Sequence, residues 1–287
     1  TISSESGLID ANVEAIGADW YRCSVTYNDT LTDIRLYVSD NATSQVLGSI
    51  YIQDAQLEQG LIATDYIETT TTTAQAGILE DMPRLDYSGG ASCPSLLLEP
   101  QRTNKITNSE YINTITFNHT SNLTISNSYA TSPDGLINAA KITPDATNGY
   151  HQLRTSLATL NGTDIISAFV KADGYNYAQL ASWANPNNYV NFDLTNGSVS
   201  VIGSIPPSIY GIDDYGNGWY RIYANVQASG GGIVGIGVIT SGAAGWAQSF
   251  VGNETDGILI YGCQLEDASY PTSYIPTYGT SQTRSGD

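Results

Sequence analysis

Two windows of the chain combine aromatic rings with carboxamide side chains. The first runs from residue 175 to residue 189 and the second from residue 246 to residue 250. Flat rings can pack against the C–H faces of pyranose sugars, and carboxamides can replace the water that hydrogen-bonds to sugar hydroxyls. These windows predict glycan binding; the competing interpretation is that their two tryptophans only cover the ends of a β-sandwich. The candidate residues are Tyr175, Tyr177, Trp183, Asn185, Asn188, Tyr189, Trp246 and Gln248.

Paired carboxylates could instead indicate hydrolysis of a glycosidic bond, which needs two carboxyl groups at a defined separation. The candidates are Asp213 with Asp214, and Glu254 with Asp256. Both pairs are in Asn- and Gly-rich sequence, where Asp commonly forms the local hydrogen bonds of turns. Neither histidine is in a motif that would activate a serine nucleophile. We therefore predict that the chain is not an enzyme, with an accessory part of a glycoside hydrolase or lyase as the remaining alternative.

The content of histidine, cysteine and carboxylate limits the metal chemistry of the chain. Two histidines and three scattered cysteines do not form a zinc-ligand pattern. Twenty-eight Asp and Glu residues could assemble an oxygen-only site, so a structural calcium ion is a candidate cofactor, without named ligands. We interpret Cys23, Cys93 and Cys263 as buried free thiols, because three cysteines cannot pair completely.

The charge balance excludes several classes of partner. Lys and Arg number 10 and Asp and Glu 28, which gives a formal net charge of −18. Such a chain repels phosphate backbones and anionic lipid head groups, so we expect neither nucleic-acid binding nor membrane insertion. Only 13% of the residues are charged, while 20 are tyrosine, which predicts an uncharged polar surface suited to sugars.

Strand patterns dominate the elements that must position these side chains. In residues 219–227 the faces alternate, with Ile222 and Ala224 on one side and Arg221 and Tyr223 on the other. The sequence contains no long stretch with apolar residues at helical spacing. Short, evenly spaced strands with turns rich in Asn and Gly predict an all-β protein built from antiparallel β-sandwiches.

An internal repeat divides the chain. The triplet Trp-Tyr-Arg at residues 20–22 recurs 199 residues later at 219–221. The triplet Gln-Leu-Glu at residues 56–58 recurs 208 residues later at 264–266. The nine extra residues of the second copy fall in the Gly- and Ala-rich stretch 229–245, where a longer loop is tolerated.

The repeat separates structural residues from candidates for function. Residues that both copies share should serve the shared fold, with the guanidinium stacked on the indole. The position of Tyr223 differs, because its counterpart is Ser24, and Tyr223 therefore joins the glycan-binding candidates. The residues predicted to be structural are Trp20, Arg22, Trp219 and Arg221.

The two copies also differ in how much sequence precedes them. Far fewer residues come before Trp20 than separate the first copy from Trp219. We expect residues 1–75 to be the C-terminal part of a first β-sandwich, whose opening strands lie outside this chain rather than being supplied by another chain. Residues 76–110 are expected to be a linker with short strands, and residues 111–287 a complete second sandwich.

Six short motifs spread over most of the chain form a specific combination. They are Pro83–Tyr87, Cys93–Asn104, Ser132–Gly135, Gly218–Arg221, Gly262–Glu266 and Ser273–Pro276. Together they resemble bacteriophage tail-fibre and virion appendage proteins with carbohydrate-binding-module-like jelly-roll domains. The resemblance implies jelly-roll sandwiches of the lectin type, a virion surface location after assembly in the host cytoplasm, and glycan recognition. It also implies that the parent protein continues in both directions and that the motifs serve the scaffold.

The leading hypothesis is a non-catalytic virion surface or tail-fibre module for adhesion to host or environmental polysaccharide. Its partners would be a polysaccharide or cell-surface glycan and other virion proteins. A homotrimer is considered because fibre proteins commonly trimerise, although the sequence has no heptad or collagen-like repeat. One alternative is a purely structural virion domain, in a fibre or as a decoration. The other is an accessory carbohydrate-binding module of a secreted polysaccharide-degrading enzyme.

Overall fold

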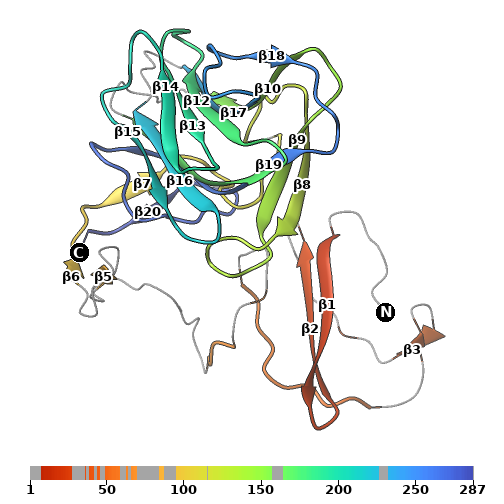
Figure 1. Ribbon diagram of the computed structural model, residues 1–287. Coiled ribbons are helices and arrows are strands. Elements are labelled where there is room, and N and C mark those ends of the chain that lie inside the picture. Colours follow the sequence, from red (N-terminus) through yellow and green to blue (C-terminus); the bar gives the residue numbers. More distant parts are fainter. Residues whose placement is uncertain are drawn as a thin grey trace. The chain divides into compact units, whose positions relative to one another are not determined.

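The chain is built from β-strands (Figure 1). The computed structural model describes residues 8–27, 36, 39–41, 44–45, 49–58, 63, 66–69, 84–86, 95–114, 116–156, 164–225 and 232–286. Every regular element within these ranges is a strand, so the all-β prediction is confirmed, and none of their segments forms a helix able to cross a membrane. The chain divides into two compact units, Thr1–Leu79 and Glu80–Asp287.

Two large antiparallel sheets form the body of the second unit (Figure 1). Sheet I has the order β14 (Ser198–Ile202), β13 (Tyr189–Asp193), β12 (Tyr177–Ser182), β17 (Ile233–Ile239), β10 (Gly149–Ser156) and β18 (Ser249–Phe250). Sheet II has the order β15 (Tyr210–Asp214), β16 (Trp219–Asn225), β11 (Asp164–Asp173), β19 (Gly257–Asp267), β9 (Ala139–Pro144) and β8 (Leu123–Ala130).

One hydrophobic core joins the two sheets. Alternate residues of each strand point into it, as the period of two requires. Leu153, Leu180, Phe192 and Ile236 come from sheet I, and Ile142, Val170, Ile222 and Ile260 from sheet II. Because both inner faces contribute to the same cluster, the second unit is a β-sandwich. The alternation expected for residues 219–225 is confirmed, since Ile222 and Ala224 lie in this core; residues 226–231 lie outside the described ranges.

The segment before β8 belongs to the second unit. β7 (Arg102–Asn104) pairs with β20 (Gln282–Arg284), and β5 (Arg84–Asp86) pairs with β6 (Ser95–Leu97). Asn104 is fully buried; its Oδ1 accepts hydrogen bonds from the amides of Ile106 and Leu265, and its Nδ2 donates to the carbonyls of Cys263 and Ile275. Residues 102–106, placed in the linker from the sequence, therefore lie within the sandwich body.

Two of the motifs singled out from the sequence meet in a buried polar network. Gln264 on β19 accepts a hydrogen bond from the amide of Ile275 (2.7 Å) and donates one to Glu266 (2.8 Å). Glu266 in turn accepts hydrogen bonds from the amide and hydroxyl of Thr272. These contacts fix the segment after β19 against the strand itself, which is a scaffold role.

The first unit contains a hairpin formed by β1 (Leu8–Gly17) and β2 (Trp20–Tyr27), and a short pair formed by β3 (Ser39–Asn41) and β4 (Ser44–Gln45). The expectation of buried thiols is wrong for Cys23, which is exposed on β2. It is confirmed for Cys263, where burial raises the thiol pKa to about 12. Cys93 lies outside the described residues.

Candidate functional site

The outer face of sheet I presents an ordered grid of side chains. Since Leu153 on β10 points into the core, its neighbours Gln152 and Arg154 point outward. The pairing register places Gln152, Gly237, Gln179 and Asn191 in one row across four strands. The adjacent row contains Arg154, Gly235, Ala181 and Tyr189.

Three aromatic rings and one guanidinium gather on this face. Trp183, which follows β12, lies 4.3 Å from Trp246 and 5.3 Å from Tyr150 between ring centroids. The Cζ of Arg154 lies 4.4 Å from the ring centroid of Trp183 and 5.3 Å from that of Tyr150. We call these four residues the aromatic platform. Tyr150 is exposed and both tryptophans are half-buried, so a ligand can reach the rings.

Two glycines of β17 make room for the side chains of Arg154 and Gln152 on the outer face of sheet I. A Cβ at Gly235 would lie 2.7 Å from Cγ of Arg154, and a Cβ at Gly237 would lie 3.0 Å from Cγ of Gln152. Burial lowers the pKa of the Arg154 guanidinium, and Tyr150 acts in the opposite direction. Nη2 of Arg154 donates to the Ser121 hydroxyl, whereas Nε of Arg154 and Oε1 of Gln152 are buried without a hydrogen-bond partner among the described residues.

A loop of residues 240–248 holds Trp246 in place. Gln179 and Asn191, both fully buried, anchor this loop from the strands beneath it. Gln179 accepts a hydrogen bond from the amide of Ala247 (2.9 Å) and donates to the carbonyl of Gly245 (3.0 Å) and to Asn191 (2.7 Å). Asn191 donates to two further loop carbonyls. The indole nitrogen of Trp246 donates to the carbonyl of Ser182 at 3.1 Å, so the ring has a fixed position.

The structure brings some of the sequence-predicted candidates together. Trp183 and Trp246, from separate windows, are in contact. Tyr189 lies on the same outer face, in the row of Arg154. Tyr177 lies beside the loop, because a Cβ at Gly242 would be 3.1 Å from its Cε1.

Three carboxamide candidates serve local structure. Asn185 accepts a hydrogen bond from the amide of Asn187, and Asn188, which is buried, donates to the carbonyl of Ile205. Gln248 accepts from the amide of Thr240 and donates to its hydroxyl, both at 2.8 Å. These interactions shape the turn after β12 and close the loop that carries Trp246.

Two tyrosine candidates lie away from the platform. Tyr175 packs against the core and lies 5.5 Å from the ring of Phe250; burial raises its pKa, and the charge of Asp256 adds to this. Tyr223 is on β16 of sheet II, where its hydroxyl lies over Gly211. Its pKa is raised by burial and then by Asp213. Tyr223 therefore belongs to a different sheet from the two tryptophans.

The four residues predicted to be structural differ in their surroundings. Trp219 is buried and donates to the carbonyl of Thr131. The ring under the guanidinium of Arg221 is Phe169, at 5.5 Å, rather than the indole expected from the sequence. In the first unit Trp20 is exposed, and Arg22 lies on the polar face of the hairpin, in a depression that Asp10 and Glu14 also line.

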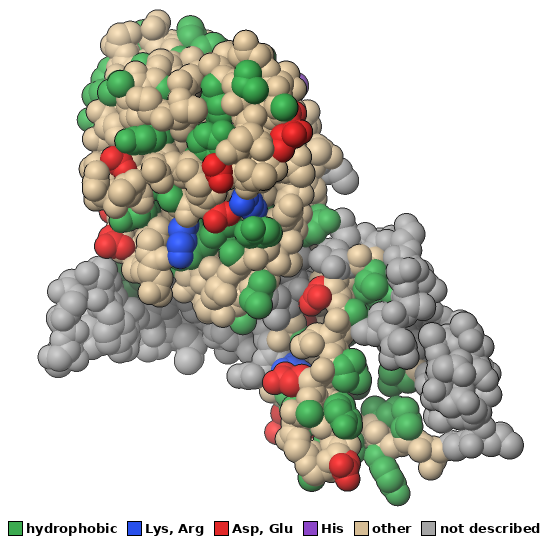
Figure 2. All heavy atoms as spheres, turned by 45° about the vertical axis from the view of Figure 1, so that its right-hand side comes forward, with side chains coloured by type: hydrophobic (Ala, Val, Ile, Leu, Met, Phe, Trp, Pro, Cys, Tyr) green, Lys and Arg blue, Asp and Glu red, His purple; other side chains and the backbone are tan. Residues whose placement is uncertain are grey.

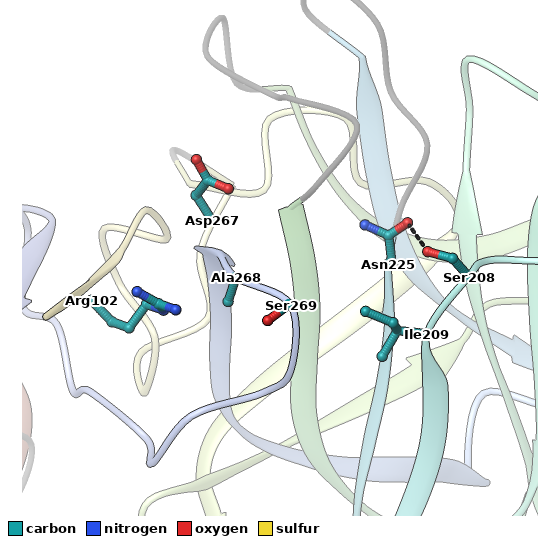
Figure 3. Close-up of a pocket in the computed structure, with 7 residues that line it drawn as sticks. All are labelled: Arg102, Ser208, Ile209, Asn225, Asp267, Ala268 and Ser269. Carbon is teal, nitrogen blue, oxygen red and sulfur yellow. Dashed lines mark hydrogen bonds between the residues drawn. The ribbon is translucent and has the colours of Figure 1, made fainter. Parts of the chain in front are cut away.

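The second unit has a pocket where β7 and the ends of β16 and β19 come together (Figure 3). The pocket has a volume of about 350 Å³ and is lined by Arg102, Ser208, Ile209, Asn225, Asp267, Ala268 and Ser269. Figure 3 shows Arg102 pointing toward the turn at Asp267–Ser269, with Ser208 and Asn225 hydrogen-bonded on the opposite side. The lining has no aromatic ring, so this pocket lacks the surface that packs against a sugar.

Three of the four carboxylates considered for catalysis have local partners. Asp213 lies within β15 opposite Arg221, so its placement in a turn was wrong, while Asp214 accepts a hydrogen bond from the amide of Gly216. Asp256 accepts one from Asn253 in the loop before β19. Within the described ranges, no group of three or more His, Cys, Asp or Glu could hold a metal ion. Calcium binding stays a prediction.

A pair of carboxylates, buried Glu110 and exposed Asp134, was not anticipated. The hydroxyl of Tyr261 lies 2.7 Å from Asp134 and 3.2 Å from Glu110. Burial raises the pKa of Glu110, although the hydroxyl of Tyr261 acts in the opposite direction. Burial also acts to raise the pKa of Asp134, but hydrogen bonds, the largest from Ser132 and Asn138, lower it overall.

The raised pKa of Glu110 predicts that ionising this residue destabilises the fold. The folded state binds the proton of Glu110 more tightly than the unfolded state does. The stabilisation from this group is therefore fully present below its ordinary pKa of 4.5 and is lost as the pH rises through the pKa of the folded state. Glu110→Gln should therefore raise the melting temperature at pH 7 by about 2–4 °C and have little effect at pH 4. Thermal unfolding followed by circular dichroism at both pH values measures this.

Glu99→Gln is the matched control for this experiment. Glu99 is buried and its carboxylate lies 3.1 Å from Nη2 of Arg284. Neutralising a buried acid that has a cationic partner should lower the melting temperature at pH 7. A Glu110→Gln variant that is less stable than the parent at pH 7 would contradict the prediction.

No protein-family model and no curated protein matches this chain. The geometry of the platform and the motifs in the sequence therefore carry the functional inference.

Four platform and anchor residues were not among the sequence candidates: Tyr150, Arg154, Gln179 and Asn191. The alternation of β10 was a usable signal for the first two, because it places Tyr150, Gln152 and Arg154 on one face. No local signal identifies Gln179, because its role depends on a loop more than 60 residues later in the chain.

Proposed function

We propose that the second unit is a non-catalytic glycan-binding module that binds its ligand on the aromatic platform. The observation that carries this proposal is the contact between Trp183 and Trp246, with Tyr150 and Arg154 beside them, on an accessible face of sheet I. Rings present a flat apolar surface to the C–H groups of a sugar, and the guanidinium of Arg154 beside them carries hydrogen-bond donors for its oxygens.

Preorganisation of the rings supports binding over a purely architectural role. The loop that carries Trp246 is hydrogen-bonded to Gln179 and Asn191, and Trp183 is held by its amide, which donates to the carbonyl of Ile233 at 2.7 Å. A ligand that meets rings already in position does not have to order them, so less of the interaction energy is lost on binding.

The segments around the platform are uncharged, which favours a ligand with little or no charge. The two segments that carry the tryptophans, residues 183–189 and 240–248, contain no Asp, Glu, Lys or Arg. Neutral hydroxyl and amide groups exchange hydrogen bonds with water for hydrogen bonds with sugar hydroxyls at small net cost.

The biological setting that we propose is the surface of a bacteriophage virion. The sequence motifs resemble those of tail-fibre and appendage proteins with jelly-roll domains, and a two-sheet sandwich is the architecture that such domains require. The module would attach the virion to host or environmental polysaccharide, in contact with other virion proteins.

Trp183→Ala is expected to weaken glycan binding by at least about tenfold, which corresponds to about 1.4 kcal/mol. A glycan array followed by titration calorimetry with the best polysaccharide measures the effect. Tyr150→Ala should weaken binding in the same direction without disturbing the loop. Tyr210→Ala is the matched control, because Tyr210 on sheet II and Tyr150 are both 37% exposed.

The control should bind like the parent protein. If neither the parent nor any variant binds a polysaccharide on the array, the proposal is wrong and the purely structural role is favoured. If binding survives in both Trp183→Ala and Tyr150→Ala, the ligand site lies elsewhere on the molecule.

A further inference from the structure

The hairpin of the first unit repeats a hairpin of the second unit in three dimensions. Asn12 is opposite Ser24 in the pairing of β1 with β2, and Gly211 is opposite Tyr223 in the pairing of β15 with β16. Gly211 follows Asn12 by 199 residues and Tyr223 follows Ser24 by 199 residues, which is the offset between the two Trp-Tyr-Arg triplets. β1 and β2 are therefore the equivalents of β15 and β16 in the same register.

The turns of the two hairpins also match. Each consists of three consecutive residues with positive φ, a conformation that residues other than glycine rarely adopt. In the first unit they are Gly17, Ala18 and Asp19, and in the second Gly216, Asn217 and Gly218. Such a run in both hairpins shows that the equivalence includes the backbone path.

A second segment of the first unit is equivalent to β19. At the offset of 208 residues, Asp54 has φ +56° and Gly262 has φ +59°. The amide of Ile67 donates to Oε1 of Gln56 at 2.7 Å, as the amide of Ile275 does to Gln264 at the same distance. The described part of the first unit thus contains equivalents of β15, β16 and β19.

In the second unit β11 lies between β16 and β19 and pairs with both. In the first unit, the described sheet that contains β2 has only β1 and β2. Equivalent side chains differ accordingly: Trp20 is 39% exposed and Trp219 3%, while Val25 is 54% exposed and its equivalent Ala224 1%. Figure 2 shows hydrophobic side chains open to solvent in the first unit.

We propose that the first unit is an acceptor for the complementary half of a β-sandwich, whose edge strand pairs antiparallel with β2. The occupant is a polypeptide strand with the alternation of β11. Ile166, Ala168 and Val170 of β11 enter the core beside β16, so the incoming strand carries small or branched apolar residues at these positions. The rest of the occupant supplies the opposing sheet that covers Tyr21, Cys23 and Val25.

The outer face of the incoming strand should carry an aromatic residue opposite Arg22. On β11, Phe169 is opposite Arg221 and lies under its guanidinium. The equivalent position of the occupant faces Arg22, and an aromatic residue there would make the same contact. Addition of a strand to an exposed sheet edge is a recurrent mode of recognition, in which main-chain hydrogen bonds give affinity and alternate side chains give specificity.

The test uses the full 287-residue chain and a fluorescent synthetic peptide with the sequence of Asp164–Asp173. Fluorescence anisotropy reports binding, and hydrogen–deuterium exchange reports protection of the amides in Trp20–Tyr27. We expect saturable binding and at least about tenfold slower exchange in β2. A peptide with Ile166→Asp and Val170→Asp places charges at two positions that would enter the core, and it should do neither.

Variants of the chain locate the bound peptide. Val25→Asp places a charge on the apolar face opposite the equivalent of Ile166 and should weaken binding by at least about tenfold. Asn12→Asp, on the polar face of β1, is the control and should bind as the parent does. Absence of peptide binding, or equal binding to Val25→Asp, would overturn the proposal. Protection of β2 that increases with protein concentration in the absence of peptide would also overturn it, by assigning the surface to a second copy of the chain.

Discussion

Gln264→Leu is expected to lower the free energy of unfolding by about 3–5 kcal/mol. The side chain is fully buried, accepts a hydrogen bond from the amide of Ile275 and donates to Glu266. Leucine has a similar size but cannot replace either bond, so a buried amide and a buried carboxylate each lose a partner. Each loss costs about 1–3 kcal/mol. Urea denaturation followed by circular dichroism measures the change.

Gln248→Leu is the matched control, because it makes the same substitution at a less buried position. Gln248 is half-buried, and its side chain hydrogen-bonds to the amide and the hydroxyl of Thr240. Water can replace part of these interactions, so we expect a loss of about 1 kcal/mol or less. Equal destabilisation by the two variants would show that the network around Gln264 does not have the importance assigned to it.

Gln179→Leu is expected to release the loop of residues 240–248 and to reduce glycan binding as strongly as removal of Trp246. The variant leaves the amide of Ala247 without its acceptor and the Asn191 carboxamide without its donor. We expect a loss of about 2–4 kcal/mol in the free energy of unfolding. Chymotrypsin should cleave after Trp246 at least about tenfold faster, because cleavage needs a loop that opens locally.

Mass spectrometry of the digestion products measures that cleavage site directly. The control is Gln282→Leu. Gln282 lies on β20, and its side-chain carboxamide donates a hydrogen bond to the Thr280 hydroxyl in an exposed contact. This variant should leave both the cleavage after Trp246 and the glycan affinity unchanged. A Gln179→Leu protein with a protease-resistant loop and full affinity would contradict the role of Gln179 as the loop anchor.

The class of the fold could be predicted because strand alternation is a local property. In β16 the apolar residues Ile222 and Ala224 enter the core shared by the two sheets, while Trp219 and Arg221 lie on the other face of sheet II. This alternation is visible in the sequence alone. Short strands separated by turn residues favour sheets over helices whatever the tertiary contacts are. The arrangement of twelve strands in two sheets could not be predicted, because pairing joins segments that are distant in the chain.

The candidate site was predictable in its chemistry and only partly in its membership. Residue type identified Trp183 and Trp246, but the comparison of the two repeat copies added Tyr223, which lies on sheet II. Arg154 was missed because its proximity to Trp183 depends on the path across Gly235 of β17. Which aromatic residues share a surface is set by strand order and register, and neither is written in the local sequence.

The repeat shows most clearly where local information ends. The sequence determined that the triplets at 20–22 and 219–221 adopt the same hairpin, because turn geometry and strand alternation depend on neighbouring residues. Only the tertiary structure decided that Trp219 is buried and Trp20 exposed. Burial depends on whether another strand and an opposing sheet cover the residue, and these come from chain segments that are remote from the triplet itself.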